Sequence, residues 1–118
     1  MKLTEAQEKA YNKIKEYINF AKECKTFKEY EIRQDTDHAK NRPDYEELVK
    51  WSTEKYEKDE QYYEEHYKQY WLDARENNIA LTSNVSSSTL RALEKKGLIR
   101  IIEDGRNYVD RVQLIDGE

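Results

Sequence analysis

The final third of the chain carries the pattern that constrains the fold most, because a suitable residue marks each of its boundaries. Ser86 is a good N-cap for a helix whose leucines recur at helical spacing. Gly97 follows two lysines, as expected where a helix ends in a left-handed residue. Beyond it, Asp104 and Gly105 form a hairpin-turn signal between two apolar-rich segments. The pattern predicts a helix over 86–96 followed by two strands.

The start of the chain carries an equally clear helix signal. Thr4 and Gln7 have the spacing of a capping box, in which each side chain bonds a backbone N–H of the other residue. An apolar stripe then recurs every three or four positions, which predicts a helix over about 4–24. Its members are Ala6, Ala10, Ile14, Tyr17, Ile18 and Ala21. Residues 25–43 are compatible with a short strand, a loop or an extension of this helix.

Residues 44–77 contain neither proline nor glycine and carry an apolar stripe at three-and-four spacing. One continuous helix here would be about 50 Å long, which exceeds what a small domain can cover. The stripe is interrupted at Lys58, Asp59 and Glu60. Either the helix breaks there, or it projects and leaves aromatic surface for a partner. We expect a long helix or helical hairpin that mediates a homodimer.

The C-terminal pattern also resembles a known family. The segment from Val85 to Ile99 resembles the recognition helix of winged helix-turn-helix DNA-binding proteins, which are common among bacterial and phage regulators. The opening, Leu3 to Gln7, resembles the start of their first helix. The resemblance implies a helix over 78–84 in front of the recognition helix. It also makes the middle of the chain a large insertion.

The resemblance implies binding of double-stranded DNA for transcriptional or replication control in a bacterium or mobile element. Two-fold dimers of this type occupy half-sites about one helical turn apart. The outward face of the recognition helix would reach the major groove, its end the flanking backbone, and the wing tip the minor groove. The residues are Ser87, Ser88 and Arg91, then Lys95 and Arg100, then Arg106 and Asn107. The alternative is that these are ordinary solvated positions.

The distribution of charge favours a competing function. The net charge is -4, and residues 44–76 hold eleven acidic against five basic side chains. Such a tract is either the solvated face of a helix or a surface that docks on a basic protein target. A phage-type inhibitor, for example an anti-CRISPR-like protein, would use it in the second way. The residues concerned are Glu57, Glu60, Glu64, Tyr63 and Tyr67.

Signatures of catalysis are missing from the sequence. His38 and His66 are far apart, Cys24 is the single cysteine, and the three glycines make no phosphate-binding loop. We therefore expect no enzyme, no metal and no cofactor. The single cysteine suits a reducing compartment, and no apolar run approaches the ~20 residues of a membrane span. These features predict a cytoplasmic protein with no membrane partner.

The size of the chain, 118 residues, predicts one domain over 1–118. Its fold class is expected to be α+β and mainly α. The expected architecture is a winged helix-turn-helix over 4–24 and 78–115, with a C-terminal β-hairpin wing. The long helix or helical hairpin over 44–77 is inserted between its parts.

Overall fold

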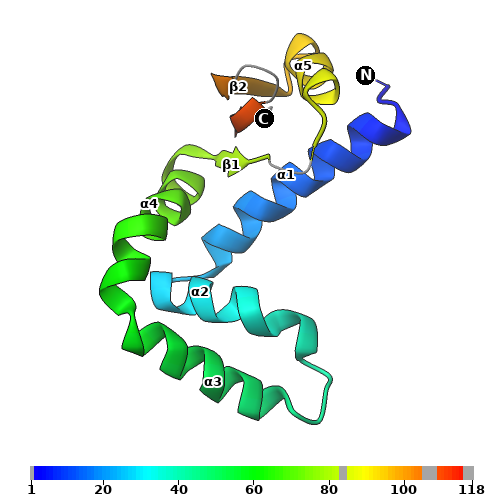
Figure 1. The fold of residues 1–118 in the computed structure, drawn as a ribbon. Coiled ribbons are helices and arrows are strands. Elements are labelled where there is room, and N and C mark those ends of the chain that lie inside the picture. Colours follow the sequence, from blue (N-terminus) through cyan, green and yellow to red (C-terminus); the bar gives the residue numbers. More distant parts are fainter. Residues whose placement is uncertain (1, 83–84, 105–108, 116–118) are drawn as a thin grey trace.

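The computed structural model describes residues 2–82, 85–104 and 109–115 (Figure 1). Within these ranges the chain is mainly helical and carries one antiparallel sheet, which confirms the expected α+β class. The elements in chain order are α1 (Glu5–Glu23), α2 (Phe27–Thr36), the short 3-10 helix η1 (Asp37–Ala39), α3 (Tyr45–Lys58), α4 (Glu60–Asn77), β1 (Ile79–Leu81), α5 (Ser87–Lys95), β2 (Ile99–Asp104) and β3 (Val109–Leu114).

Helix α1 forms where the sequence predicts it, and the capping box at its start is present. The backbone N–H of Gln7 donates to the Thr4 hydroxyl at 3.2 Å, and the Gln7 side chain accepts from the Thr4 N–H at 3.2 Å. The buried residues of α1 are Ala10, Ile14, Ile18 and Ala21. Their spacing gives one stripe along the whole helix, so α1 can face two different cores along its length.

The segment that the sequence left open contains a helix of its own. Helix α2 begins after Thr26, whose hydroxyl accepts from the Glu29 N–H at 3.1 Å. Phe27 and Tyr30 on its first turn are buried, and α2 packs along α3. Most of residues 25–43 thus form α2 and η1, a separate helical segment, and residues 40–43 form a turn.

The expected long helix is broken, at the place where its apolar stripe is interrupted. Helix α3 ends at Lys58, Asp59 has non-helical dihedrals (φ −124°, ψ 32°), and α4 begins at Glu60. No apolar side chain at 58–60 is available to hold a straight helix against the rest of the molecule. The chain bends instead, so that α3 lies along α2 while α4 returns along α1 (Figure 1).

A strand begins where the family resemblance implied a helix over 78–84, so that expectation is wrong. Asn78 ends α4 in the left-handed conformation, with φ of 56°, and Ile79–Leu81 form strand β1. Ala80 lies opposite Val112 of β3, and both side chains are buried. Pairing with a strand more than thirty residues away overrides the local helical preference. No helix precedes α5 directly in the described part of the chain.

The C-terminal elements confirm the predicted helix and two strands. The Ser86 hydroxyl accepts from the Thr89 N–H at 3.2 Å, and Gly97 has the expected positive φ of 78°. The sheet has the order β1-β3-β2 with both pairings antiparallel. Gly105 of the predicted turn lies outside the described residues.

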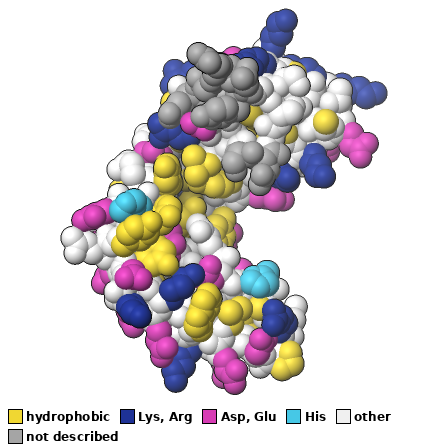
Figure 2. All heavy atoms as spheres, viewed as in Figure 1, with side chains coloured by type: hydrophobic (Ala, Val, Ile, Leu, Met, Phe, Trp, Pro, Cys, Tyr) yellow, Lys and Arg dark blue, Asp and Glu magenta, His cyan; other side chains and the backbone are white. Residues whose placement is uncertain are grey.

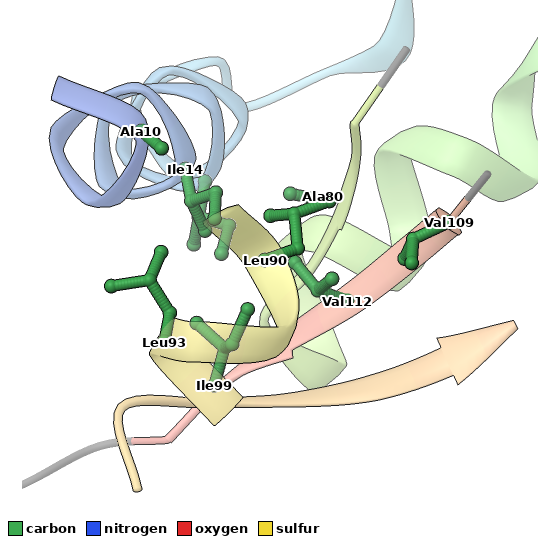
Figure 3. Close-up of a cluster of buried hydrophobic side chains, with 9 residues drawn as sticks. Ala10, Ile14, Ala80, Leu90, Leu93, Ile99, Val109 and Val112 are labelled. Atoms are coloured by element: carbon green, nitrogen blue, oxygen red, sulfur yellow. The ribbon is translucent and has the colours of Figure 1, made fainter. Parts of the chain in front are cut away.

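The molecule has two lobes with separate cores that share α1. We call the first the sheet lobe, made by the first part of α1, α5 and the sheet. Its aliphatic core comprises Ala10, Ile14, Ile18, Ala80, Leu90, Leu93, Ile99, Val109 and Val112 (Figure 3). The second, the helical lobe, is made by the end of α1 with α2, α3 and α4. Its aromatic core comprises Ala21, Cys24, Phe27, Tyr30, Tyr56, Trp71 and Ala74.

Hydrogen bonds from two side chains of α4 join this helix to the end of α1. The Trp71 indole N–H donates to the carbonyl of Ala21 at 3.1 Å. The guanidinium of Arg75 donates to the carbonyls of Ala21, Lys22 and Cys24. These carbonyls lie at the C-terminal end of α1, where a cation is favourable because the helix dipole is negative there. In the described segments no helix is both long and apolar enough to span a bilayer.

Candidate functional site

Helix α5 presents one face to the aliphatic core and the other to solvent. Leu90 and Leu93 are fully buried, which turns Ser88, Arg91 and Lys95 outward, and all three are exposed. Ser87 is half-buried. The structure therefore brings four of the predicted DNA-binding residues together on one nine-residue helix.

A groove runs between the outward face of α5 and strand β2. Its volume is about 740 Å³, and its lining consists of Ser88, Arg91, Ala92, Glu94, Lys95, Ile101 and Ile102. The Glu94 carboxylate accepts from the backbone N–H of Ile101 at 2.9 Å and so holds the helix to the strand. The groove is thus bordered by the cations Arg91 and Lys95 and by Ile101 and Ile102. Its one carboxylate, Glu94, is engaged by the backbone of β2.

Arg100 does not belong to this surface. On β2, Ile99 and Ile101 face the aliphatic core and α5, so Arg100 between them points to the opposite side of the sheet. There its guanidinium donates to the side-chain oxygen of Gln113 at 2.8 Å. Strand alternation therefore places Arg100 on the other face of the sheet from Lys95, so the two residues do not share one surface. Arg106 and Asn107 lie outside the described residues.

Two lysines that the sequence alone did not single out lie beside the start of α5. Lys9 and Lys13 of α1, both exposed, line a hollow of about 200 Å³ together with Val85, Ser86 and Thr89. In the sequence, their four-residue spacing indicates that both lie on one face of α1, next to the stripe that contains Ala10 and Ile14. Only the packing of α1 on α5 shows that they border the helix N-terminus.

The acidic residues of the competing hypothesis are distributed over the helical lobe. Glu57 pairs with Lys28 of α2 at 2.7 Å, Glu64 lies 3.9 Å from Lys68, and Glu60 is exposed. Tyr63 stacks on Tyr56 with ring centres 5.7 Å apart and packs against the aromatic core. Tyr67 is 39% exposed and lines a pocket. Glu57 and Glu64 thus each lie beside a lysine, and Tyr63 belongs to the aromatic core.

The pocket that Tyr67 lines lies where the two lobes meet, and we call it the aromatic pocket. Its volume is about 330 Å³, and it is lined by Tyr17, Phe20, Tyr30, Glu31, Gln34, Tyr67, Tyr70 and Leu81. These residues come from α1, α2, α4 and β1, so no local sequence pattern could have assembled them. Burial raises the pKa of Tyr30 and of Tyr17, whose phenols share a hydrogen bond. Both phenols are therefore neutral at physiological pH.

The described residues contain no group of three His, Cys, Asp or Glu side chains placed to hold a metal ion. Comparison of the chain with protein-family models, with curated proteins and with solved structures gives no match. The candidate functional surfaces are the outward face of α5 and the aromatic pocket.

Proposed function

We propose that the chain binds double-stranded DNA through α5 and the adjoining part of α1. The observation that carries the proposal is the outward face of α5, where Ser88, Arg91 and Lys95 stand together beside a groove. Hydroxyl and guanidinium groups on an exposed helix suit contacts with base edges and phosphates in a major groove. Lys9 and Lys13 extend the cationic surface around the N-terminus of the helix.

The charge of the two lobes agrees with this assignment. Residues 2–16 and 78–115, which make up most of the sheet lobe, hold ten basic and seven acidic side chains. Residues 17–77 hold eleven basic and sixteen acidic side chains. A DNA duplex would therefore meet the sheet lobe first, with the acidic lobe turned away from the phosphates.

The order of elements supports a variant of the winged-helix arrangement. Helix α1 is followed, after the inserted helices α2 to α4, by the short strand β1, helix α5 and the antiparallel pair β2 and β3, and β1 pairs with β3. The helix that normally stands before the recognition helix has no counterpart in the described residues. In this proposal Lys9 and Lys13 of α1 take over its usual contact with the DNA backbone.

Control of transcription or replication would then follow by steric occupancy of a DNA site. A homodimer through residues 44–77 remains part of this proposal, because Trp51 on α3 and Tyr62 on α4 are 53% and 50% exposed. Sedimentation of the purified protein tests the dimer separately. A monomer at DNA-binding concentrations would remove the two-fold operator and leave single-site binding.

A fluorescence-anisotropy titration with a labelled duplex of random sequence tests DNA binding directly. At about 50 mM salt, counterion release should favour even non-specific binding, and the affinity should fall steeply as salt rises. Arg91→Ala, and the pair Lys9→Ala with Lys13→Ala, should each weaken binding. Each should also flatten the salt dependence by about one unit of log–log slope for every phosphate that the variant no longer neutralises.

The matched control is Arg100→Ala, which removes the same charge from the same lobe but from the other face of the sheet. It should bind DNA nearly as the wild type does. Equal losses of affinity for Arg91→Ala and Arg100→Ala would mean that net charge alone drives the binding. No binding at low salt would refute the proposal.

A protein-binding function is favoured by one observation on α4. Tyr67 is exposed three residues after Glu64, and the ring of Tyr62 lies against the Tyr67 ring with centres 6.1 Å apart. Aromatic and acidic side chains therefore share this part of α4. Aromatic side chains are enriched where proteins bind one another. If DNA binding fails, charge reversal at Glu57, Glu60 and Glu64 should abolish binding to a basic protein target.

A further inference from the structure

The aromatic pocket has the size and position of a small-molecule site. Its volume of about 330 Å³ lies within the range of known ligand pockets, and four elements from both lobes enclose it. Figure 2 shows hydrophobic side chains gathered over α4 and β1 in the inner bend between the lobes. Tyr67, Tyr70 and Leu81 are 39%, 39% and 40% exposed, so the apolar lining is open to solvent.

One acidic side chain, Glu31, lines this mainly aromatic pocket, with Gln34 and Leu81 as the other non-aromatic residues. Glu31 is half-buried and makes no hydrogen bond or ion pair with the described residues. Lys55, the cation that acts on Glu31, is held by Asp35 at 3.1 Å, and Asp35 also accepts a hydrogen bond from Ser52 at 2.9 Å. Lys55 and Asp35 therefore satisfy each other, and among the described residues the Glu31 carboxylate has no counter-ion of its own.

The electrostatic environment of Glu31 agrees with this geometry. Burial raises the pKa of Glu31, the nearby Asp35 raises it further, and Lys55 lowers it only in part. A partly desolvated carboxylate of this kind gains most from a cation that enters the pocket.

One ring of the pocket, that of Phe20, already lies against a cation within the protein. The guanidinium of Arg33 lies 4.9 Å from the centre of the Phe20 ring. Arg33 itself is held by Glu23, Glu29 and Asp37, with N–O distances of 3.4, 3.5 and 2.8 Å. The charge of Arg33 is therefore balanced by these three carboxylates, and Arg33 does not act as a counter-ion for Glu31.

We propose that the aromatic pocket binds a small organic ammonium ion, whose charge lies between the Glu31 carboxylate and the ring faces of the tyrosines. Aromatic faces attract cations through their quadrupole, and this attraction strengthens where water is excluded. The carboxylate adds the charge pairing that selects a cation over a neutral molecule of the same shape. This site is separate from α5, so it does not depend on the proposed DNA binding.

Choline and its uncharged isostere 3,3-dimethylbutan-1-ol provide a direct test, because the two molecules differ in charge and hardly in shape. Backbone amide shifts of the full chain, followed by NMR during titration, should move at Tyr70 and Leu81 with choline. The isostere should bind at least about tenfold more weakly, which corresponds to about 1.4 kcal/mol.

Glu31→Gln should abolish the preference for choline over the isostere. The matched control Glu46→Gln removes an equal charge from an exposed position on α3 outside the pocket and should keep the preference. Tyr67→Leu, on the exposed rim, is a second variant that avoids the buried part of the pocket. It should weaken choline binding about threefold, because leucine has no ring face to attract the cation.

Three outcomes would overturn the assignment. These are an absence of choline-induced shifts at the pocket, equal affinity for choline and the isostere, and an unchanged preference in a folded Glu31→Gln variant.

Discussion

The two lobes of this protein are built from different side chains and present opposite charges. The sheet lobe has a core of Ala, Ile, Leu and Val, which needs no hydrogen bond from its side chains, and it carries a basic surface. The helical lobe has a core rich in Phe, Tyr and Trp, and the hydroxyl of Tyr and the indole N–H of Trp need hydrogen-bond partners there. This lobe carries more acidic than basic side chains. The basic surface agrees with the proposed DNA binding, and the acidic charge of the helical lobe agrees with the proposed ammonium site in the aromatic pocket.

The largest expected effect tests whether the lobes fold separately. Leu93→Ala should lower the free energy of unfolding by about 2–5 kcal/mol, because Leu93 is fully buried and truncation leaves a cavity. Both tryptophans lie in the helical lobe, and α1 contributes to both cores. Unfolding followed by tryptophan fluorescence should therefore shift as much as unfolding followed by far-UV circular dichroism.

The control in the same lobe is Ile102→Ala, at a position 39% exposed. It should cost only about 0.5 kcal/mol. If the fluorescence transition of Leu93→Ala stays at the wild-type midpoint, the lobes unfold independently and the shared helix does not couple them.

A smaller effect is expected at the joint between α1 and α4. Arg75→Met should cost about 2 kcal/mol in urea unfolding, because it leaves the carbonyls of Ala21, Lys22 and Cys24 without their charged donor. Arg42→Met is the control, since Arg42 is exposed and pairs only with Asp44 among the described residues. That surface pair should contribute about 0–1 kcal/mol. Equal destabilisation by the two variants would show that Arg75 does not fasten the helical lobe.

The smallest effect concerns alkaline pH and is confined to the aromatic core. Burial raises the pKa of Tyr56 from 10.0 to about 12. The folded state therefore retains a proton that the unfolded state releases, and this stability is present below pH 10.0 and lost as the pH rises towards about 12. The urea midpoint should fall over that interval.

Tyr56→Phe, which has no phenol to ionise, should flatten this decline. Tyr62→Phe, at a position 50% exposed, should leave it unchanged. Tyrosinate absorbance measured along the same pH series identifies the ionisation. A decline of equal slope in wild type and Tyr56→Phe would place its cause elsewhere.

Elements with local signals were predictable from the sequence. Thr4 and Gln7 mark the start of α1, Gly97 marks the end of α5, and the charged run at 58–60 marks the break after α3. Helix α2 had a comparable signal that was overlooked, since Thr26 and Glu29 repeat the spacing of Thr4 and Gln7. The Glu29 side chain even accepts from the N–H of Lys25, at 3.4 Å.

Features that depend on distant partners were not predictable in this way. Strand β1 has only three residues and exists because β3 pairs with it. The separation of Arg100 from α5 depends on which face of β2 meets the core. The aromatic pocket draws on four elements, and the unmatched charge of Glu31 depends on a Lys55–Asp35 pair between α2 and α3. Each of these requires the tertiary arrangement.

The bonds from Arg75 to the end of α1 have a consequence for the architecture as a whole. They hold the last turn of α4 against the end of α1, so the two points where the chain enters and leaves the helical lobe lie within the reach of one arginine side chain. A segment whose ends meet can change in length or content without moving the elements on either side of it. The helical lobe is thus inserted in one connection of the sheet lobe, between α1 and β1, and Arg75 joins its two ends.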